Sequence, residues 1–421
     1  MSALIVWVAG GLLIVAAAVG VGIVALIRRQ RYIGSIRQRG WIFVNTPTFA
    51  SVARLNNPPF GLGFARQADD QILGLTATGR AFQVIEYTTR YWTGWVGMVT
   101  MSRRLPELWV TGGQTGPRYG VLAQSVAVPP QLGPGWQVGA QDPVFAQEVL
   151  TPEVCRQLTA LAAGQPGVNL SIDGDQIVVL DPPRQEVDQL GPWLDQVGAI
   201  AAAIDAAPLD HRVQPEPEPR LRFYHHPGWY WLGVDDTVLN YAPINRSGYD
   251  HRTEQVVRGR DGDGPPFVAF EHHWKTKRTE TSRDSDGNSH TRTVVEHHSE
   301  PILGFQLPIR MPRLTVGHRG LSEGISFESQ EFNERFAIFA ADLKFAYDVI
   351  HPRQMEYLLS RRGVPFTIEE DWAWFTPREH SEPAVAFCSE YLRGFLGRIP
   401  RFVWRNLGLP DTPYPDPTQV Q

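Results

Sequence analysis

The side chains best suited to chemistry are histidines and carboxylates in a charged segment of the second half of the chain. All 12 histidines follow residue 208, and several lie within FEHHWKTKRTETSRDSDGNSHTRTVVEHHSE, residues 270–300. Imidazole and carboxylate groups are ligands that suit zinc. Because neighbouring residues of a strand point to opposite faces, only one histidine of each adjacent pair could bind a metal ion. The candidate ligands are His272, His273, His297 and His298, with Glu271 and Glu296 close by.

The charge pattern of this segment favours a different interpretation, a solvated hairpin inserted into a domain. With a turn at residues 286–287, antiparallel pairing would place Lys277 opposite Glu296 and His273 opposite Glu300. Opposite charges that face each other across two strands stabilise such a ribbon. A long exposed ribbon could also serve as a docking arm for another protein.

Other catalytic patterns are weak in the sequence. Residues 320–324, GLSEG, fit the G-x-S-x-G nucleophile elbow, but that elbow requires a parallel strand before it and a helix after it. The residues around it predict hairpins instead. Cys155 and Cys388 are the only cysteines, which excludes a disulfide framework and a cysteine-based zinc site. With no phosphate-binding loop, dinucleotide fingerprint or HExxH helix, the sequence predicts no cofactor and no catalytic residue.

The N-terminal segment predicts a membrane anchor. Residues 3–27 contain no charged side chain, and a helix of that length spans a hydrocarbon core of roughly 30 Å. Several arginines follow immediately, between Arg28 and Arg39. Positive residues stay on the cytoplasmic side, so we expect a single-pass protein of the cell membrane, with the N-terminus outside and the bulk of the chain in the cytoplasm.

Two further interpretations of this segment remain open. A cleaved signal peptide is less favoured because no Lys or Arg precedes the apolar run, which is also long for a signal core. Small residues four apart, such as Ala16 and Gly20, permit close approach of two helices, so a homodimer through them is possible.

An internal duplication organises the rest of the chain. DPVFAQEVLTP, residues 142–152, matches DLKFAYDVIHP, residues 342–352. Further matches follow in the same order, including GRAFQVIEY (79–87) with GPPFVAFEH (264–272) and GVNLSIDGD (167–175) with GVPFTIEED (363–371). Colinear matches of this kind predict two similar domains.

Each copy combines hairpins with short helices, which predicts an α+β fold with mostly antiparallel sheet. Asp142 should cap a helix that starts at Pro143, and Asp173-Gly174 should form a hairpin turn between two strands. The predicted segments are an anchor (1–27), a basic juxtamembrane segment (28–39), repeat 1 (40–206), a linker (207–220), repeat 2 (221–406) with the inserted hairpin 270–300, and a disordered tail (407–421).

The second copy resembles a known family. Residues 326–352, SFESQEFNERFAIFAADLKFAYDVIHP, and the charged hairpin before them look like a family of bacterial membrane-anchored proteins that is known only as a domain of unknown function. The resemblance covers about residues 221–406 and rests on a packing pattern. It implies a membrane-tethered soluble domain and assigns no functional residue.

Together these patterns predict a non-enzymatic binding or scaffold protein, anchored in the membrane through residues 3–27, whose cytoplasmic domains bind another protein. The net charge of −5 and the lack of a long basic run argue against nucleic acid as a partner. One alternative is a metalloenzyme or hydrolase that uses the histidines of repeat 2. Another alternative is a protein that binds a lipid or a peptide between the repeats.

Overall fold

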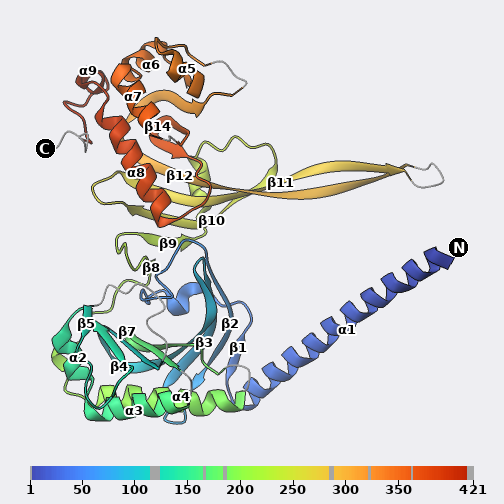
Figure 1. Ribbon diagram of the computed structural model, residues 1–421, viewed down its shortest axis with the longest axis vertical. Helices are drawn as coiled ribbons and strands as arrows, with labels where there is room; N and C mark the ends of the chain where they lie inside the picture. The colour runs from blue at the N-terminus through green and yellow to red at the C-terminus, as the bar shows by residue number, and fades with distance from the viewer. Residues whose placement is uncertain are drawn as a thin grey trace. The chain divides into compact units, whose positions relative to one another are not determined.

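The computed structural model describes residues 2–414 except 114–123, 165–166, 184–186, 284–288, 321–323 and 362–363, and except the side chains of residues 2–18, 282–283 and 290. The chain divides into two compact units: residues 1–62 with 66–219, and residues 63–65 with 220–421. Each unit contains a seven-stranded sheet. The described strand pairings are antiparallel and the helices are grouped apart from them (Figure 1), which confirms the predicted α+β class.

Unit 1 has the strand order β1-β2-β3-β4-β6-β5, with β7 also paired to β4. Helices α3 and α4 pack on one face of this sheet (Figure 1), where a single apolar core includes Ile172, Leu194 and Val197. Its elements are α1 (Ser2–Gln38), β1 (Ile42–Val44), η1 (Phe49–Val52), β2 (Arg66–Leu75), β3 (Ala81–Thr89), β4 (Trp92–Gly113), β5 (Gln124–Val126), β6 (Gln137–Ala140), α2 (Pro143–Val149), α3 (Pro152–Ala163), β7 (Gly167–Leu180), α4 (Val187–Asp205) and η2 (Asp210–Arg212).

Unit 2 has the strand order β13-β12-β11-β10-β9-β8, with β14 also paired to β12. Aromatic contacts join β14 to α8, such as Phe366 against Phe395 at 5.0 Å between ring centroids. Its elements are β8 (Leu221–Arg222), β9 (Tyr230–Gly233), η3 (Asp236–Asn240), β10 (Tyr249–Arg260), β11 (Pro266–Arg283), β12 (Ser289–His318), α5 (Gln330–Arg335), β13 (Phe336–Ala340), α6 (Leu343–Val349), α7 (Pro352–Ser360), β14 (Phe366–Phe375), α8 (Glu382–Gly397) and α9 (Arg401–Asn406).

The two sheets have corresponding strand orders. β1-β2-β3-β4-β6 in unit 1 corresponds to β9-β10-β11-β12-β13 in unit 2, and β7 and β14 each add to the long strand of their own sheet. The registers correspond as well, since Leu108 lies opposite Ala140 in one sheet and Leu314 lies opposite Ala340 in the other. The units differ at opposite edges of the sheet: unit 1 adds β5 beyond β6, and unit 2 adds β8 beyond β9, the counterpart of β1.

Local sequence signals account for the short helices. The side chain of Asp142 accepts hydrogen bonds from the N–H groups of Val144 and Phe145, which confirms the predicted N-cap of α2. Asp342 caps α6 in the same way. By contrast His351, at the N-cap of α7, makes no side-chain capping bond. Its Nε2 lies 2.9 Å from the carbonyl oxygen of Arg398 instead.

The predicted hairpin turn at Asp173-Gly174 is wrong, because both flanking segments belong to the single strand β7. Residues on either side pair with the same partner, β4, and the register shifts between Thr100 and Leu105 and again between Leu105 and Leu108, so the extra residues lie on β4. Gly174 has φ +62°, a conformation that glycine adopts readily, and it lies opposite this irregular part of β4. The segment therefore continues as one strand without reversing.

Part of the predicted linker belongs to unit 1. Ala207 and Leu209 are buried in its apolar core, and the Arg212 guanidinium lies 2.7 Å from Glu148. At the other end of the chain, residues 407–414 of the predicted disordered tail are described, whereas 415–421 lie outside the described residues.

Helix α1 contradicts the predicted membrane span and localisation. No helix in the described part of the chain is long and apolar enough to cross a membrane. The prediction of a single-pass cell-membrane protein with a cytoplasmic bulk is therefore wrong. Ala16, half of the predicted dimer motif, lies outside the described side chains, and Gly20 has open space around it.

The basic segment that follows, residues 28–39, docks the end of α1 onto unit 1. Ile36 is fully buried in the core of that unit. Arg29 lies 2.8 Å from Asp70 through Nη1, and Arg39 lies 2.6 Å from Asp188. Ile36, with Tyr32 packed beside the same core, and the ion pairs of Arg29 and Arg39 thus hold the end of α1 and the residue that follows it.

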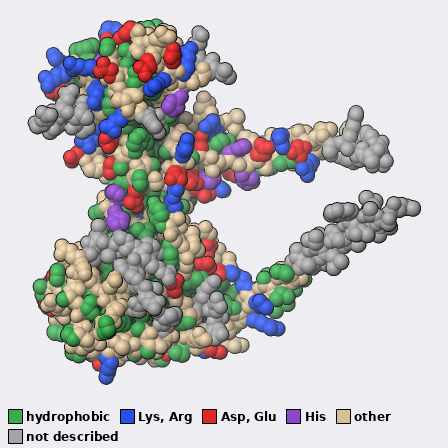
Figure 2. All heavy atoms as spheres, in the orientation of Figure 1, with side chains coloured by type: hydrophobic (Ala, Val, Ile, Leu, Met, Phe, Trp, Pro, Cys, Tyr) green, Lys and Arg blue, Asp and Glu red, His purple; other side chains and the backbone are tan. Residues whose placement is uncertain are grey.

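Strands β11 and β12 extend beyond the rest of their sheet as a two-stranded ribbon (Figure 1). They pair without a register shift from Phe267 opposite Phe305 to Arg283 opposite Ser289. Figure 2 shows histidine, acidic and basic side chains gathered along this ribbon. The inserted hairpin predicted at residues 270–300 is therefore the outer part of two sheet strands.

The predicted register of the ribbon is wrong by one residue. Lys277 lies opposite Val295, and His273 lies opposite Ser299. The connection between the paired residues Arg283 and Ser289 is longer than a two-residue turn, and the predicted turn at residues 286–287 lies outside the described residues. A slip of one residue exchanges the faces on which side chains meet.

Candidate functional site

One face of the ribbon, near its root, carries a row of rings. His272 and Trp274 are two residues apart on β11, so they share a face. Glu300 lies opposite His272, and His298 lies opposite Trp274, which places both on that same face. His251 joins them from β10, beside a register shift between Tyr249 and Arg252. We call His251, His272, Trp274, His298, Glu300 and Arg246 the root cluster.

The rings of the root cluster stack in order. The centroids of His251 and His272 are 5.1 Å apart with an interplanar angle of 12°. His272 and Trp274 follow at 4.9 Å and 15°, then Trp274 and His298 at 5.1 Å and 20°. His298 Nε2 is also hydrogen-bonded to the Thr276 hydroxyl at 2.8 Å. The row thus fixes side chains of three strands against each other.

A charged network lies beside the rings. Arg246 Nε lies 3.0 Å from each carboxylate oxygen of Glu300, and its guanidinium carbon lies 5.7 Å from the centroid of Trp274. His272 Nδ1 lies 3.3 Å from Glu300 Oε1. Burial raises the pKa of Glu300, but hydrogen bonds from Arg246 and His272 outweigh it, so that pKa lies below its usual value. Glu300 is therefore a carboxylate at neutral pH.

The histidine at the centre of the network is neutral. His272 is fully buried; burial lowers its pKa, Glu300 opposes this change, and His251 and His273 add to it, so the pKa lies below its usual value. Its Nε2 lies 2.9 Å from His251 Nδ1. Because a carboxylate only accepts hydrogen bonds, His272 donates through Nδ1–H to Glu300 and accepts at Nε2 from His251. Each ring nitrogen of His272 is engaged in this arrangement.

The predicted metal candidates are not brought together. His272 and His298 lie on one face of the ribbon with Trp274 between them, whereas His273 and His297 lie on the other face. His273 Nε2 lies 3.5 Å from carboxylate oxygens of Glu254 and Glu271. Within the part of the chain that the structure describes, no three His, Cys, Asp or Glu side chains are grouped so that they could hold a metal ion.

Sequence reasoning missed several members of the root cluster. Trp274 could have been found from the period of two that relates it to His272. His251 and Arg246 precede the predicted insertion, and the register shift that brings His251 to His272 has no simple sequence signal. Of the G-x-S-x-G pattern, residues 321–323 lie outside the described residues.

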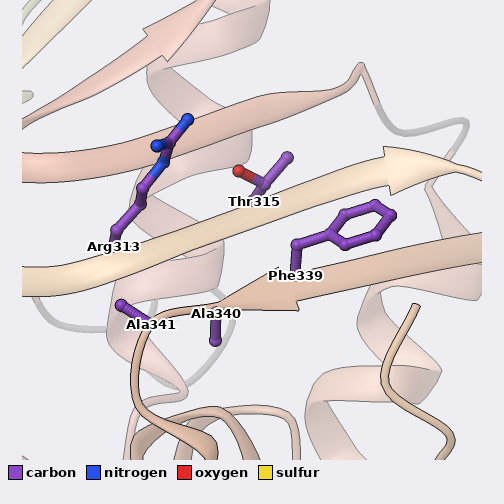
Figure 3. A pocket seen from close by; sticks show the side chains of 5 residues that line it. All are labelled: Arg313, Thr315, Phe339, Ala340 and Ala341. Atoms are coloured by element: carbon purple, nitrogen blue, oxygen red, sulfur yellow. The ribbon is translucent and has the colours of Figure 1, made fainter.

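An open pocket elsewhere in unit 2 offers little chemistry. It lies over β12 and β13 with a volume of about 520 Å³, and Figure 3 shows its lining of Arg313, Thr315, Phe339, Ala340 and Ala341. Arg313 is the single ionisable side chain of that lining. Its Nη1 also lies 3.9 Å from Glu369 Oε1. An arginine stays protonated at neutral pH, so this lining supplies a cation that could bind an anion but no general base.

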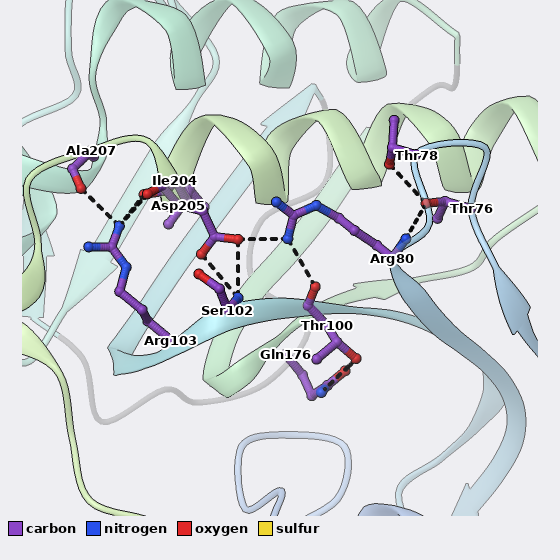
Figure 4. A network of polar contacts seen from close by, with 10 residues as sticks. All are labelled: Thr76, Thr78, Arg80, Thr100, Ser102, Arg103, Gln176, Ile204, Asp205 and Ala207. Carbon is purple, nitrogen blue, oxygen red and sulfur yellow. Dashed lines mark hydrogen bonds and ion pairs between the residues drawn. The ribbon is translucent and has the colours of Figure 1, made fainter.

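A dense polar network in unit 1 is structural (Figure 4). Asp205, the last residue of α4, lies 2.6 Å from Arg80 Nη1 and accepts from the N–H of Ser102 at 3.1 Å. Arg103 Nη2 donates to the carbonyl oxygens of Ile204, Asp205 and Ala207. These bonds satisfy carbonyl groups at the end of the helix, so the network fixes α4 to the sheet.

Comparisons with known proteins add no function to this geometry. No protein-family model matches the chain, and no curated protein does. A solved structure, the crystal structure of the mycobacterial trehalose monomycolate transport factor A, TtfA, is similar over 45% of this chain and 97% of its own, with 12% identity and a TM-score of 0.33. A likeness at that TM-score supports no argument about fold or function. The resemblance of residues 326–352 to a domain of unknown function stays a prediction.

Proposed function

We propose that this chain is a non-enzymatic binding or scaffold protein, and that its ribbon receives a protein partner. The observation that carries the proposal is an unpaired strand edge. β14 pairs with β12 from Leu303 onward, and β10 pairs with β11 no further out than Lys275. Among the described residues, no strand pairs with residues 289–302 of β12 on the side away from β11. We call this stretch the free edge; such edges are templates for strand addition.

The ribbon is held firmly enough to present that edge. A two-stranded ribbon alone is only marginally stable in water. Here the root cluster fixes one end, and cross-strand ion pairs continue outward, with Arg292 2.8 Å from Glu280 and Arg278 3.2 Å from Glu296. A stiff strand loses less conformational entropy on binding than a flexible loop does.

The arrangement of the root cluster also defines the competing hypothesis. Glu300, His272 and His251 form a hydrogen-bonded chain that ends at His251 Nε2, and such a chain could orient a general base. Stoichiometric zinc in the purified full-length protein, or a turnover that is abolished by His251→Gln, would favour a metalloenzyme or hydrolase over our proposal.

The corresponding strand orders support a second part of the proposal, that the two units are copies of one module. The support comes from the matched registers at Leu108 and Leu314 and from the matched caps Asp142 and Asp342. In this proposal the ribbon is a specialisation of unit 2. β3 and β4 form the corresponding hairpin of unit 1, and they join after Thr89 through a short connection to Trp92.

A shortened ribbon tests the docking function. Replacing residues 278–294 by Asn-Gly joins the paired residues Lys277 and Val295 through a favoured two-residue turn and keeps the root cluster. We expect proximity labelling from a fusion at the C-terminus to lose specific neighbours in this variant. Lys344→Glu, a surface change on α6, is the control and should keep them. An unchanged set of neighbours in a shortened but folded protein would contradict the proposal.

A further inference from the structure

The outer part of the free edge of β12, residues 289–300, lacks two of the features that protect exposed strands, a bulge and a proline; Pro301 lies at its inner end. Its pairing with β11 runs without a bulge from Phe305 to Ser289, and no proline interrupts residues 289–300. Natural edge strands commonly carry a bulge or a proline that prevents pairing with another chain. An even, uninterrupted edge is suited to continuing the sheet with one more strand.

The sequence of this edge is complementary to itself. In an antiparallel pair, residues directly opposite each other share a face of the sheet. If two copies of β12 pair around a two-fold axis at Val294, Arg292 of each copy lies opposite Glu296 of the other. Thr293 then lies opposite Val295, and Val294 lies opposite itself. The axis at Val294 is also the midpoint between Ser289 and Ser299, so most of the free edge takes part.

The neighbouring two-fold registers are worse. An axis at residue 292 or at residue 296 places two arginines or two glutamates opposite each other. An axis at Thr293 places Arg292 opposite Val294, and an axis at Val295 places Arg292 opposite His298. Like charges directly opposite across strands are destabilising and opposite charges are stabilising. Charge complementarity therefore selects the axis at Val294.

The side chains of this edge are exposed and already arranged for such a contact. The Arg292 side chain is 77% exposed and that of Glu296 is 38% exposed. On the same face, Arg292 is paired within its own ribbon to Glu280, and Glu296 is paired to Arg278. Joining two ribbons would extend each pair into a row of alternating charges across four strands.

The opposite face contributes an uncharged contact. Val295 is 43% exposed, and Thr279, Thr281, Thr291 and Thr293 follow on the same face of the two strands. Pairing across the axis brings Val295 of each copy against Thr293 of the other. β-branched side chains pack well on a pleated surface, so this face would gain packing where the first face gains ion pairs.

From these observations we infer that the chain self-associates through the free edge of β12, forming a symmetric dimer around Val294. The inference rests on the proposed function, because it names a second copy of this chain as the protein that the ribbon receives. The contact is isologous, so the Arg292–Glu296 pair occurs twice in each dimer.

Mixing two charge variants of the full-length protein tests the inference. Arg292→Glu alone places two pairs of glutamates opposite each other in a homodimer, and Glu296→Arg alone places two pairs of arginines. We expect either variant to weaken the dimer on the order of tenfold in Kd at low salt, measured by sedimentation equilibrium. An equimolar mixture restores both opposite-charge pairs, so we expect a 1:1 heterodimer, identified by native mass spectrometry from its mass, with nearly the wild-type Kd.

Recovery of the dimer on mixing distinguishes a lost contact between two copies from damage to the ribbon itself. Each variant loses the same contacts within its own ribbon whether it is mixed or alone, so damage to the ribbon would not be repaired by mixing. A wild-type protein that stays monomeric, or a mixture that does not recover, overturns the inference. If ribbon shortening still removes neighbours in that case, the proposed function stands with a different protein on the edge. If self-association behaves as expected but shortening removes no neighbour, the wider docking function fails and self-pairing stands.

Discussion

Replacing Asp173 by Asn should change how the stability of unit 1 depends on pH. Asp173 is buried, and its Oδ2 accepts hydrogen bonds from the N–H groups of Asn56 at 2.8 Å and Asn57 at 2.9 Å. Burial raises its pKa from 3.8 to about 7, although these two bonds oppose the shift. An amide oxygen in the variant can accept both bonds, so the substitution removes the charge and keeps the contacts.

The sign of the effect follows from proton binding. Because the pKa of Asp173 is higher in the folded protein than in the unfolded chain, the folded state binds more protons between about pH 4 and pH 7. The contribution of Asp173 to the free energy of unfolding is present in full below pH 4 and is lost as the pH rises through 7. Three pH units at about 1.4 kcal/mol each give a loss of at most about 4 kcal/mol. The Asp173→Asn variant should not show this loss.

Buried thiols allow the two units to be measured separately. Cys155 is buried in unit 1 and Cys388 is buried in unit 2. Urea unfolding of the full-length protein, followed by pulsed thiol labelling at each cysteine, gives the free energy of unfolding of each unit. The stability that unit 1 gains from Asp173→Asn, measured by labelling of Cys155, should grow from pH 4 to pH 8. Asp188→Asn, which removes an exposed carboxylate of the same unit, serves as the control. A gain that stays constant across this range would refute the reasoning.

Three further outcomes are expected. His380 should act in the opposite direction in unit 2, because burial lowers its pKa to about 4 and the unfolded chain therefore binds more protons between about pH 4 and pH 6.5. The free energy of unfolding of unit 2, measured by labelling of Cys388, should decrease as the pH is lowered from 6.5 to about 4 in the wild type but not in His380→Gln. Glu300→Gln should cost on the order of 1 kcal/mol by removing the charged partner of Arg246, seen as faster hydrogen exchange in residues 241–248; unchanged exchange would argue against the network. Asp142→Ala and Asp342→Ala should each lower the Tm of their own unit, and an effect in one unit alone would weaken the proposal of a duplicated module.

Much of the local structure follows from the sequence because the responsible interactions are local. The caps at Asp142 and Asp342 depend on N–H groups only two and three residues away, so residue type and spacing are sufficient to predict them. The antiparallel α+β class follows from hairpins and short helices for the same reason. The position of the ribbon in the sequence was also predictable, because alternating charges and a turn signal are properties of neighbouring residues.

The sequence by itself therefore determined where the short helices α2 and α6 begin and which segment forms the ribbon. Only the tertiary structure decided which side chains meet. The register of the ribbon differs by one residue from the predicted register, extra residues of β4 lie opposite Gly174 where a turn was predicted, and a register shift in β10 brings His251 to His272. A strand alternates faces at every residue, so one added or displaced residue changes every contact beyond it. No local pattern contains that information.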